Sequence, residues 1–93
     1  MKPRFEGRVA IVTGARQGIG YAVAQRFYAQ GASVVLWDVD QAQTRRAQEE
    51  LDPGGQRSLA VSGSVADTEA VAVAFRAIAE RFSAEGAQVI VNG

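Results

Sequence analysis

The fold is decided by residues 9–20, which read VAIVTGARQGIG. The first four residues are apolar and do not alternate with polar ones, which is typical of a strand covered on both faces. A loop with glycines at positions 14, 18 and 20 follows, and an amphipathic segment then runs from about Gly18 to Gln30, before the stop signal Gly31. This stretch therefore predicts a strand, a glycine-rich loop and a helix, in that order.

The rest of the chain repeats the alternation of strand and helix. Asp40 and Asp67 are each suited to capping a helix, because a carboxylate there accepts hydrogen bonds from the first backbone amides. The further elements expected are a strand at 34–38, a helix at about 41–51, a strand at 58–62, a helix from 68 to about 82, and a strand at 88–92.

Strands that are separated by helices pair in parallel through right-handed crossovers. Two crossovers on one face of a sheet, followed by one on the other face, give the strand order 3-2-1-4. The fold class expected is α/β: half of a doubly wound Rossmann fold, with a parallel four-stranded sheet and helices on both faces. The 93 residues suffice for one domain, residues 1–93.

Apolar spacing predicts which helix residues are buried. The buried residues expected in the first helix are Ile19, Val23, Phe27 and Ala24, and those in the mostly polar second helix are Ala42, Ala47 and Leu51.

Composition excludes several classes of site. The chain has no Cys and no His, so a Ser-His-Asp triad, a His-Cys dyad and a typical zinc site are excluded. Ten basic residues balance ten acidic ones, which gives no electrostatic reason to expect a nucleic acid or a membrane as partner. Neither a signal peptide nor an apolar run of membrane-spanning length is present, so a cytoplasmic protein is expected.

The glycine loop has the features of a phosphate-binding turn. Gly14 allows a sharp turn out of the strand, and Gly18 and Gly20 let the backbone approach a phosphate and the helix pack closely on the sheet. The helix N-terminus adds amide donors and the positive end of a dipole, which suit a pyrophosphate. A tight turn also explains a glycine cluster, but its place between a buried strand and a helix favours binding. A nucleoside-triphosphate P-loop is excluded, because no Lys occupies the start of the helix.

Two charged residues bear on which dinucleotide binds. Asp38 ends the second strand, 18 residues after Gly20. A carboxylate there can accept hydrogen bonds from both hydroxyls of the adenosine ribose and would repel a 2′-phosphate, which favours NAD over NADP. The alternative for Asp38 is a helix cap or a surface acid, but Asp40 fits the cap better. Arg16 is either a partner for a phosphate or a solvated loop residue, and the sequence favours neither.

With these residues identified, the chain resembles the N-terminal part of a short-chain dehydrogenase/reductase. The family pattern Thr-Gly-x-x-x-Gly-x-Gly is matched by Thr13, Gly14, Gly18 and Gly20. The resemblance implies that the Ile19 amide contacts the pyrophosphate, that Asp38 holds the ribose, and that Val39 lies beside the adenine. It also assigns the adenine contact to Ser64-Val65, where the family usually has Asp-Val, and matches Asn92 at the end of the last strand. The cofactor-binding residues expected are Gly14, Arg16, Gln17, Gly18, Ile19, Gly20, Asp38, Val39, Ser64, Val65 and Asn92.

The catalytic Ser and Tyr-x-x-x-Lys of that family have no counterpart here. Tyr21 is followed four residues on by Gln25 and Tyr28 by Ala32, and the one Lys is at position 2. Without a Tyr acid and a Lys to lower its pKa, the chain alone is not expected to transfer hydride. The leading hypothesis is an NAD-binding module truncated before the catalytic segment. The alternatives are part of an active oxidoreductase whose remaining segment is missing or supplied by another chain, and a self-assembling αβ fragment without a tight ligand.

The third helix is apolar on more than one face. Its sheet-facing stripe is expected to be Val71, Phe75, Ile78 and Phe82, and a second stripe is Ala70, Val73, Ala74 and Ala77. In the resembled family this helix packs against another subunit, and an apolar face of this kind is usually covered, although Ala is also tolerated on a surface. The last strand is likewise expected to be an exposed edge that invites pairing. Both features predict a homodimer or a larger assembly.

Overall fold

A computed structural model of the chain describes residues 5–64, 66–82 and 88–90. Strands and helices alternate along it, as the sequence predicts. The elements are β1 (Val9–Thr13), α1 (Gly18–Ala29), β2 (Ser33–Asp38), α2 (Gln41–Leu51), β3 (Ser58–Ser62), α3 (Thr68–Arg81) and β4 (Gln88–Ile90).

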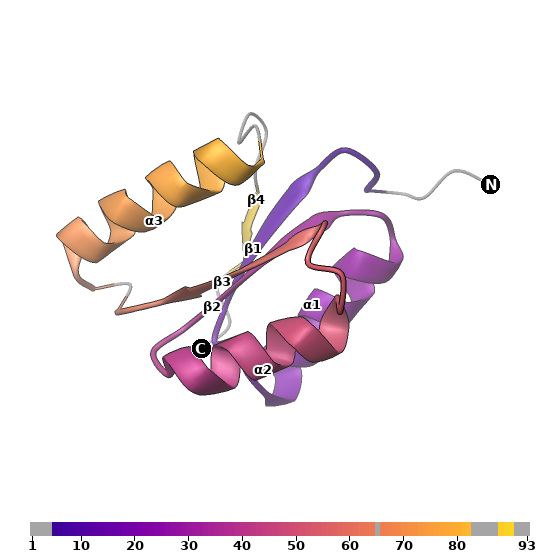
Figure 1. The fold of residues 1–93 in the computed structure, drawn as a ribbon, viewed down its shortest axis with the longest axis horizontal. Coiled ribbons are helices and arrows are strands. Elements are labelled where there is room, and N and C mark those ends of the chain that lie inside the picture. Colours follow the sequence, from indigo (N-terminus) through magenta and orange to yellow (C-terminus); the bar gives the residue numbers. More distant parts are fainter. Residues whose placement is uncertain (1–4, 65, 83–87, 91–93) are drawn as a thin grey trace.

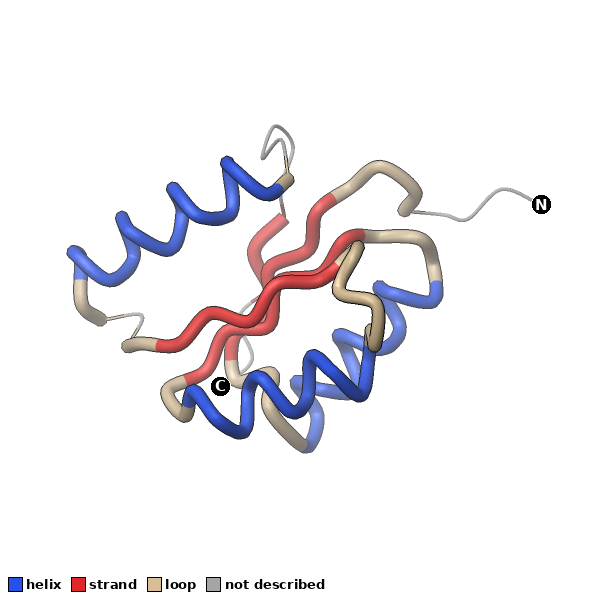
Figure 2. Tube along the Cα trace, in the orientation of Figure 1, coloured by secondary structure: helices blue, strands red, loops and turns tan. Residues whose placement is uncertain are grey.

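The strands form one parallel sheet in the order β3-β2-β1-β4, which confirms the predicted topology. The sheet lies between two layers of helices, with α1 and α2 on one face and α3 on the other (Figure 1). The tube in Figure 2 shows how the strands run side by side between these layers. The chain thus forms half of a doubly wound Rossmann fold. Because the strands are parallel, their carboxyl ends meet at one edge of the sheet.

The two central strands are buried on both faces, since successive side chains of a strand point to opposite sides. One set of side chains packs against α1 and α2, and the other set packs against α3. The first set includes Ala10, Val12, Val34 and Leu36, and the second set includes Val9, Ile11, Val35 and Trp37.

Small residues let α1 approach the sheet. Gly20 and Ala24, one turn apart, are its buried residues, and Val23 and Phe27 pack partly buried against the same core. The prediction that Ile19 belongs to this buried face is wrong, because its side chain is 74% exposed. Successive helix residues are rotated by about 100°, so a helix that places Gly20 against the sheet turns its neighbour outward.

Both predicted aspartate caps are confirmed. The Asp40 carboxylate accepts a hydrogen bond from the Gln43 amide at 2.9 Å and begins α2. The Asp67 carboxylate accepts hydrogen bonds from the amides of Glu69 and Ala70 at 3.0 and 3.2 Å and begins α3. These bonds satisfy amide donors that lack a partner within the helix.

The buried face of α2 differs from the prediction at one residue. Ala47 is buried and Leu51 is partly buried, as expected, but Ala42 is exposed. Thr44 takes a buried position instead, and its hydroxyl donates a hydrogen bond to the carbonyl of Asp40 at 2.6 Å. A pattern based on apolar residues misses this position, because the local hydrogen bond satisfies the Thr hydroxyl.

The two stripes predicted on α3 are rotated slightly in the structure. Ile78 is fully buried, and Ala74, which was assigned to the outer stripe, is only 4% exposed. Phe75 is 40% exposed, and its ring meets Trp37 edge-on with 6.3 Å between the ring centroids. The small side chain of Ala74 fits between the helix and the sheet, which leaves the larger Phe75 at the rim.

A buried carboxylate joins three elements at the end of the sheet away from the glycine loop. Asp52, which follows α2, is 6% exposed and accepts hydrogen bonds from the Tyr28 hydroxyl at 2.8 Å, the Ser58 hydroxyl at 2.7 Å and the Arg57 amide at 3.0 Å. Burial raises the pKa of Asp52, but the hydrogen bonds from Ser58, Tyr28 and Arg57 outweigh burial and hold the pKa below its usual value. This carboxylate therefore ties α1, α2 and β3 together.

Two of the residues predicted from the sequence as cofactor contacts, Val65 and Asn92, lie outside the described residues, as does the end of the predicted strand at 88–92. Within the described ranges, none of the helices has both the length and the apolar character needed to cross a bilayer.

Candidate functional site

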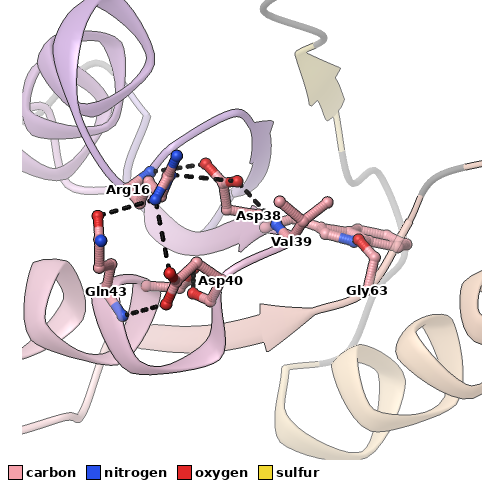
Figure 3. Close-up of polar contacts among 8 residues, drawn as sticks. Arg16, Asp38, Val39, Asp40, Gln43 and Gly63 are labelled. Carbon is pink, nitrogen blue, oxygen red and sulfur yellow. Dashed lines mark hydrogen bonds and ion pairs between the residues drawn. The ribbon is translucent and has the colours of Figure 1, made fainter.

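The carboxyl ends of three neighbouring strands bring the predicted site residues together. The glycine loop follows β1, Asp38 ends β2, and Gly63 and Ser64 follow β3. Figure 3 shows the polar contacts between these segments. The site is therefore built where parallel sheets of this type hold their ligands.

Two glycines of the loop have backbone conformations that other residues adopt only with strain. Gly14 has φ 63° and Gly18 has φ 64°, in the left-handed region. A Cβ added to Gly18 would meet nothing within 4 Å, so the residue borders open space rather than packed protein. The loop thus presents backbone to a space that a ligand can enter.

The first turn of α1 lacks the side-chain cap found on the other two described helices. Gln17 is the N-cap residue, and its side chain makes no hydrogen bond to the turn. Gln17, Gly18 and Ile19 are all exposed. An uncapped helix N-terminus offers amide donors and the positive end of the helix dipole to an anion.

Asp38 is held against the glycine loop by backbone amides. Its Oδ2 accepts a hydrogen bond from the Arg16 amide at 3.3 Å, and its Oδ1 accepts one from the Val39 amide at 2.7 Å. A carboxylate has about four lone-pair sites, two on each oxygen. Oδ2 therefore retains one further acceptor site, and the second site of Oδ1 lies beside the Arg16 Nε at 3.6 Å.

The Arg16 side chain contacts two carboxylates that the sequence did not link to it, and its role toward a phosphate stays a prediction. Its Nε lies 3.6 Å from Asp38 Oδ1, and its NH1 lies 3.7 Å from Asp40 Oδ2. NH1 also donates a hydrogen bond to Gln43 Oε1 at 2.8 Å (Figure 3). One guanidinium is thus shared by two carboxylates, which leaves this cluster with a net charge of −1 from Arg16, Asp38 and Asp40.

Hydrogen bonds fix the loops after β1, β2 and β3 to one another. The Ala15 amide donates to the Trp37 carbonyl at 3.4 Å, and the Gly63 amide donates to the Asp38 carbonyl at 3.0 Å. The Trp37 indole Nε1 donates to the Gly63 carbonyl at 3.0 Å. The position of Asp38 is therefore set from both sides, by the glycine loop and by the loop after β3.

Two further predicted contacts lie at this edge of the sheet. Val39 directly follows Asp38 and is 69% exposed. Ser64 is exposed, and its Oγ accepts a hydrogen bond from the Ala66 amide at 3.1 Å, while its hydroxyl proton has no acceptor among the described residues. An apolar surface and a neutral donor are thus present where the sequence predicts the adenine.

The sequence did not reveal the partners of Arg16. Asp40 was predicted only as a helix cap, and Gln43, on the polar second helix, is 27 residues from Arg16 in the chain. No spacing rule links residues that far apart, so only the three-dimensional fold identifies this contact. The bond from Trp37 to Gly63 was missed for the same reason.

Comparisons with known proteins agree with this architecture. The family model described as short chain dehydrogenase matches residues 8–93. An uncharacterized oxidoreductase of Mycobacterium bovis is 40% identical over 92 residues, which cover 99% of this chain and 36% of that protein. The galactitol 2-dehydrogenase of Agrobacterium fabrum is 34% identical over 89 residues, which cover 96% of this chain and 33% of that protein.

Solved structures show the same similarity. A 3-ketoacyl-(acyl-carrier-protein) reductase from Brucella melitensis, complexed with NADH, matches with a TM-score of 0.78 and 37% identity over 85% of this chain and 31% of that one. A short-chain dehydrogenase/reductase from Brucella melitensis, described as a glucose/ribitol dehydrogenase, matches with a TM-score of 0.79 and 32% identity over 88% of this chain and 34% of that one. The chain therefore spans about a third of the length of the relatives it matches.

Proposed function

The chain belongs to the short-chain dehydrogenase family, and from this premise we propose that it is the NAD-binding half of an oxidoreductase. The observation that carries the proposal is the hydrogen bond from the Arg16 amide to Asp38 Oδ2, at 3.3 Å. This bond joins the glycine loop to the carboxylate at the end of β2, so that a pyrophosphate site and a ribose site adjoin.

The proposed roles follow from the chemistry of each group. The turn at Gly14 and Gly18, the close packing at Gly20 and the amide of Ile19 form the pyrophosphate site. Asp38 accepts hydrogen bonds from the ribose hydroxyls, and the net negative charge of its cluster disfavours a 2′-phosphate, which supports NAD over NADP.

Val39 and Ser64 are the proposed contacts to the adenine, and Gln17 borders the pyrophosphate at the start of α1. Val65 and Asn92 join the proposed site on sequence grounds alone. When bound, NAD supplies the nicotinamide ring that exchanges a hydride with a substrate.

The tyrosines of this chain are not suited to proton donation in such a reaction. Burial and the nearby Glu50 raise the pKa of Tyr21 above its usual value. The hydrogen bond to Asp52, together with burial, raises the pKa of Tyr28. A tyrosine is a more effective general acid near neutral pH when its pKa is lowered toward that pH. We therefore propose that this chain contributes cofactor binding, and that hydride transfer requires residues from a longer protein or from another chain.

Titration of the 93-residue chain with NAD and with AMP, followed by calorimetry, tests the proposal. We expect a dissociation constant of about 0.01–1 mM for NAD, because the site described covers mainly the adenosine half. AMP should bind nearly as tightly as NAD for the same reason. The fluorescence of Trp37, the only Trp of the chain, gives a second signal beside Asp38. If neither NAD nor AMP binds at millimolar concentration, the proposed function is rejected.

We also propose that a second copy of the chain covers the exposed apolar side chains of α3. Val73, on the side of α3 toward β3, is 61% exposed, and Phe75, on the other side of the buried Ala74, is 40% exposed. Sedimentation velocity at several protein concentrations should show a sedimentation coefficient that rises with concentration. A monomer that persists at the highest concentration would contradict the pairing.

A further inference from the structure

The side chain of Arg16 lies against the proposed ribose site, and its role there rests on the proposed function. If a ribose hydroxyl binds to Asp38, a phosphate on that hydroxyl would lie next to Arg16, whose Nε is 3.6 Å from Asp38 Oδ1. A free guanidinium in this position would attract the phosphate and offset the repulsion from Asp38. The contacts of Arg16 with α2 therefore bear on the choice of cofactor.

Arg16 is restrained on the side away from Asp38. Gln43 accepts a hydrogen bond from NH1 at 2.8 Å, and Asp40 Oδ2 lies 3.7 Å from the same atom. Asp40 is the N-cap of α2 and Gln43 lies in its first turn, where the Gln43 amide donates a hydrogen bond to Asp40 Oδ1. A 2′-phosphate that recruits Arg16 must break or share these contacts.

We propose that Asp40 and Gln43 are specificity-determining residues of this site, because they hold Arg16 and keep its guanidinium from compensating a 2′-phosphate. In this arrangement Asp38 repels the phosphate. Asp40 and Gln43 hold back Arg16, which is the one cation that lies against Asp38 among the described residues. Preference for NAD then depends on the restraint of Arg16 as well as on Asp38.

Two variants release Arg16 in different ways. Gln43→Ala removes the hydrogen bond to NH1 and changes no charge. Asp40→Asn removes one negative charge and retains the helix cap, since Asn caps as well as Asp. Gln41→Ala is the matched control, because Gln41 is exposed in the same turn and makes no described contact with Arg16.

AMP and adenosine 2′,5′-bisphosphate are suitable probes, because they differ only by the 2′-phosphate. The ratio of their dissociation constants, measured by calorimetry with the Trp37 fluorescence as a check, reports discrimination directly. Compared with the unmodified chain, we expect this ratio to shift toward the bisphosphate by about threefold in Gln43→Ala and about fivefold in Asp40→Asn, which is the scale of exposed charge contacts. Gln41→Ala should leave the ratio unchanged.

A double variant shows whether the effect passes through Arg16. Adding Arg16→Gln to Gln43→Ala should abolish the gain in bisphosphate binding, because no guanidinium remains to be released. This inference is overturned if the gain in bisphosphate binding persists without Arg16. It is also overturned if AMP binds but the ratio is unchanged in both Gln43→Ala and Asp40→Asn. Either result leaves the proposed function standing. If AMP does not bind the unmodified chain, the proposed function itself is rejected and this inference with it.

Discussion

Replacing Asp52 with Ala is expected to lower the free energy of unfolding by about 3 kcal/mol, which is a large part of the stability of a domain of this size. The substitution removes the acceptor for the Tyr28 hydroxyl, the Ser58 hydroxyl and the Arg57 amide. Asp52 and Ser58 are both buried, so the donors left behind gain little compensating contact with water. Asp52→Asn retains one acceptor oxygen and should cost about half as much.

Chemical denaturation followed by the fluorescence of Trp37 measures these differences. Glu49→Ala, an exposed position on α2, is the matched control and should change the free energy of unfolding by less than about 0.5 kcal/mol. If Asp52→Ala is as stable as this control, the three hydrogen bonds do not stabilise the fold as described.

The same carboxylate predicts how stability depends on pH. The pKa of Asp52 is lowered in the folded state, so its contribution is fully present above the unfolded pKa of about 3.9 and is lost as the pH falls through the folded pKa. The pKa of Tyr28 is raised, so its contribution is present below about pH 10 and is lost as the pH rises through the folded value. The acid loss should be absent from Asp52→Asn, and the alkaline loss should be absent from Tyr28→Phe.

The second large effect is expected at Asp38. Asp38→Ala should weaken NAD binding by about tenfold to a hundredfold, because hydrogen bonds to a charged acceptor contribute about 1.5–3 kcal/mol. The variant should bind NADP with a smaller loss, since the same change removes the charge that repels a 2′-phosphate. The preference for NAD over NADP should therefore weaken.

Stability must be measured alongside affinity in this variant. Asp38 also accepts hydrogen bonds from the amides of Arg16 and Val39, so its loss affects the fold of the loop as well as the ligand site. Asp38→Asn provides the comparison, because it retains an acceptor but not the charge. Chemical denaturation measures the effect of each variant on the fold, and calorimetric titration with NAD and NADP measures its effect on the ligand site. An unchanged preference between the two nucleotides in a folded variant would remove Asp38 from the site.

Much of the fold could be predicted because its signals are local. The apolar run before Thr13, the glycines of the loop and the caps Asp40 and Asp67 each mark an element boundary by short-range chemistry. The strand order 3-2-1-4 followed from the handedness of the crossovers, and the pairing of the strands confirms it.

The details that could not be predicted depend on contacts between distant residues. Ile19 was assigned to the core because its spacing fits, yet the packing of Gly20 turns its side chain outward. Thr44 is buried because a bond to Asp40 satisfies its hydroxyl, which a hydropathy pattern does not encode.

The candidate site shows the same division between local and distant information. The glycine loop and Asp38 were recognisable because the loop directly follows one strand and Asp38 is the last residue of the next. The contacts of Arg16 with Asp40 and Gln43 depend on how α2 packs beside the loop, so they could be identified only from the folded chain.

We propose that the glycine loop binds the phosphates of an adenine nucleotide beside Asp38. A heteronuclear NMR titration of the ¹⁵N-labelled chain with NAD tests it most directly, because each loop amide reports separately. We predict that the amides of Gly14, Gly18, Ile19 and Gly20 shift progressively, together with that of Val39, and that the shifts saturate with one dissociation constant. Unchanged resonances in the loop at millimolar NAD, in a chain whose spectrum shows that it is folded, would contradict the account.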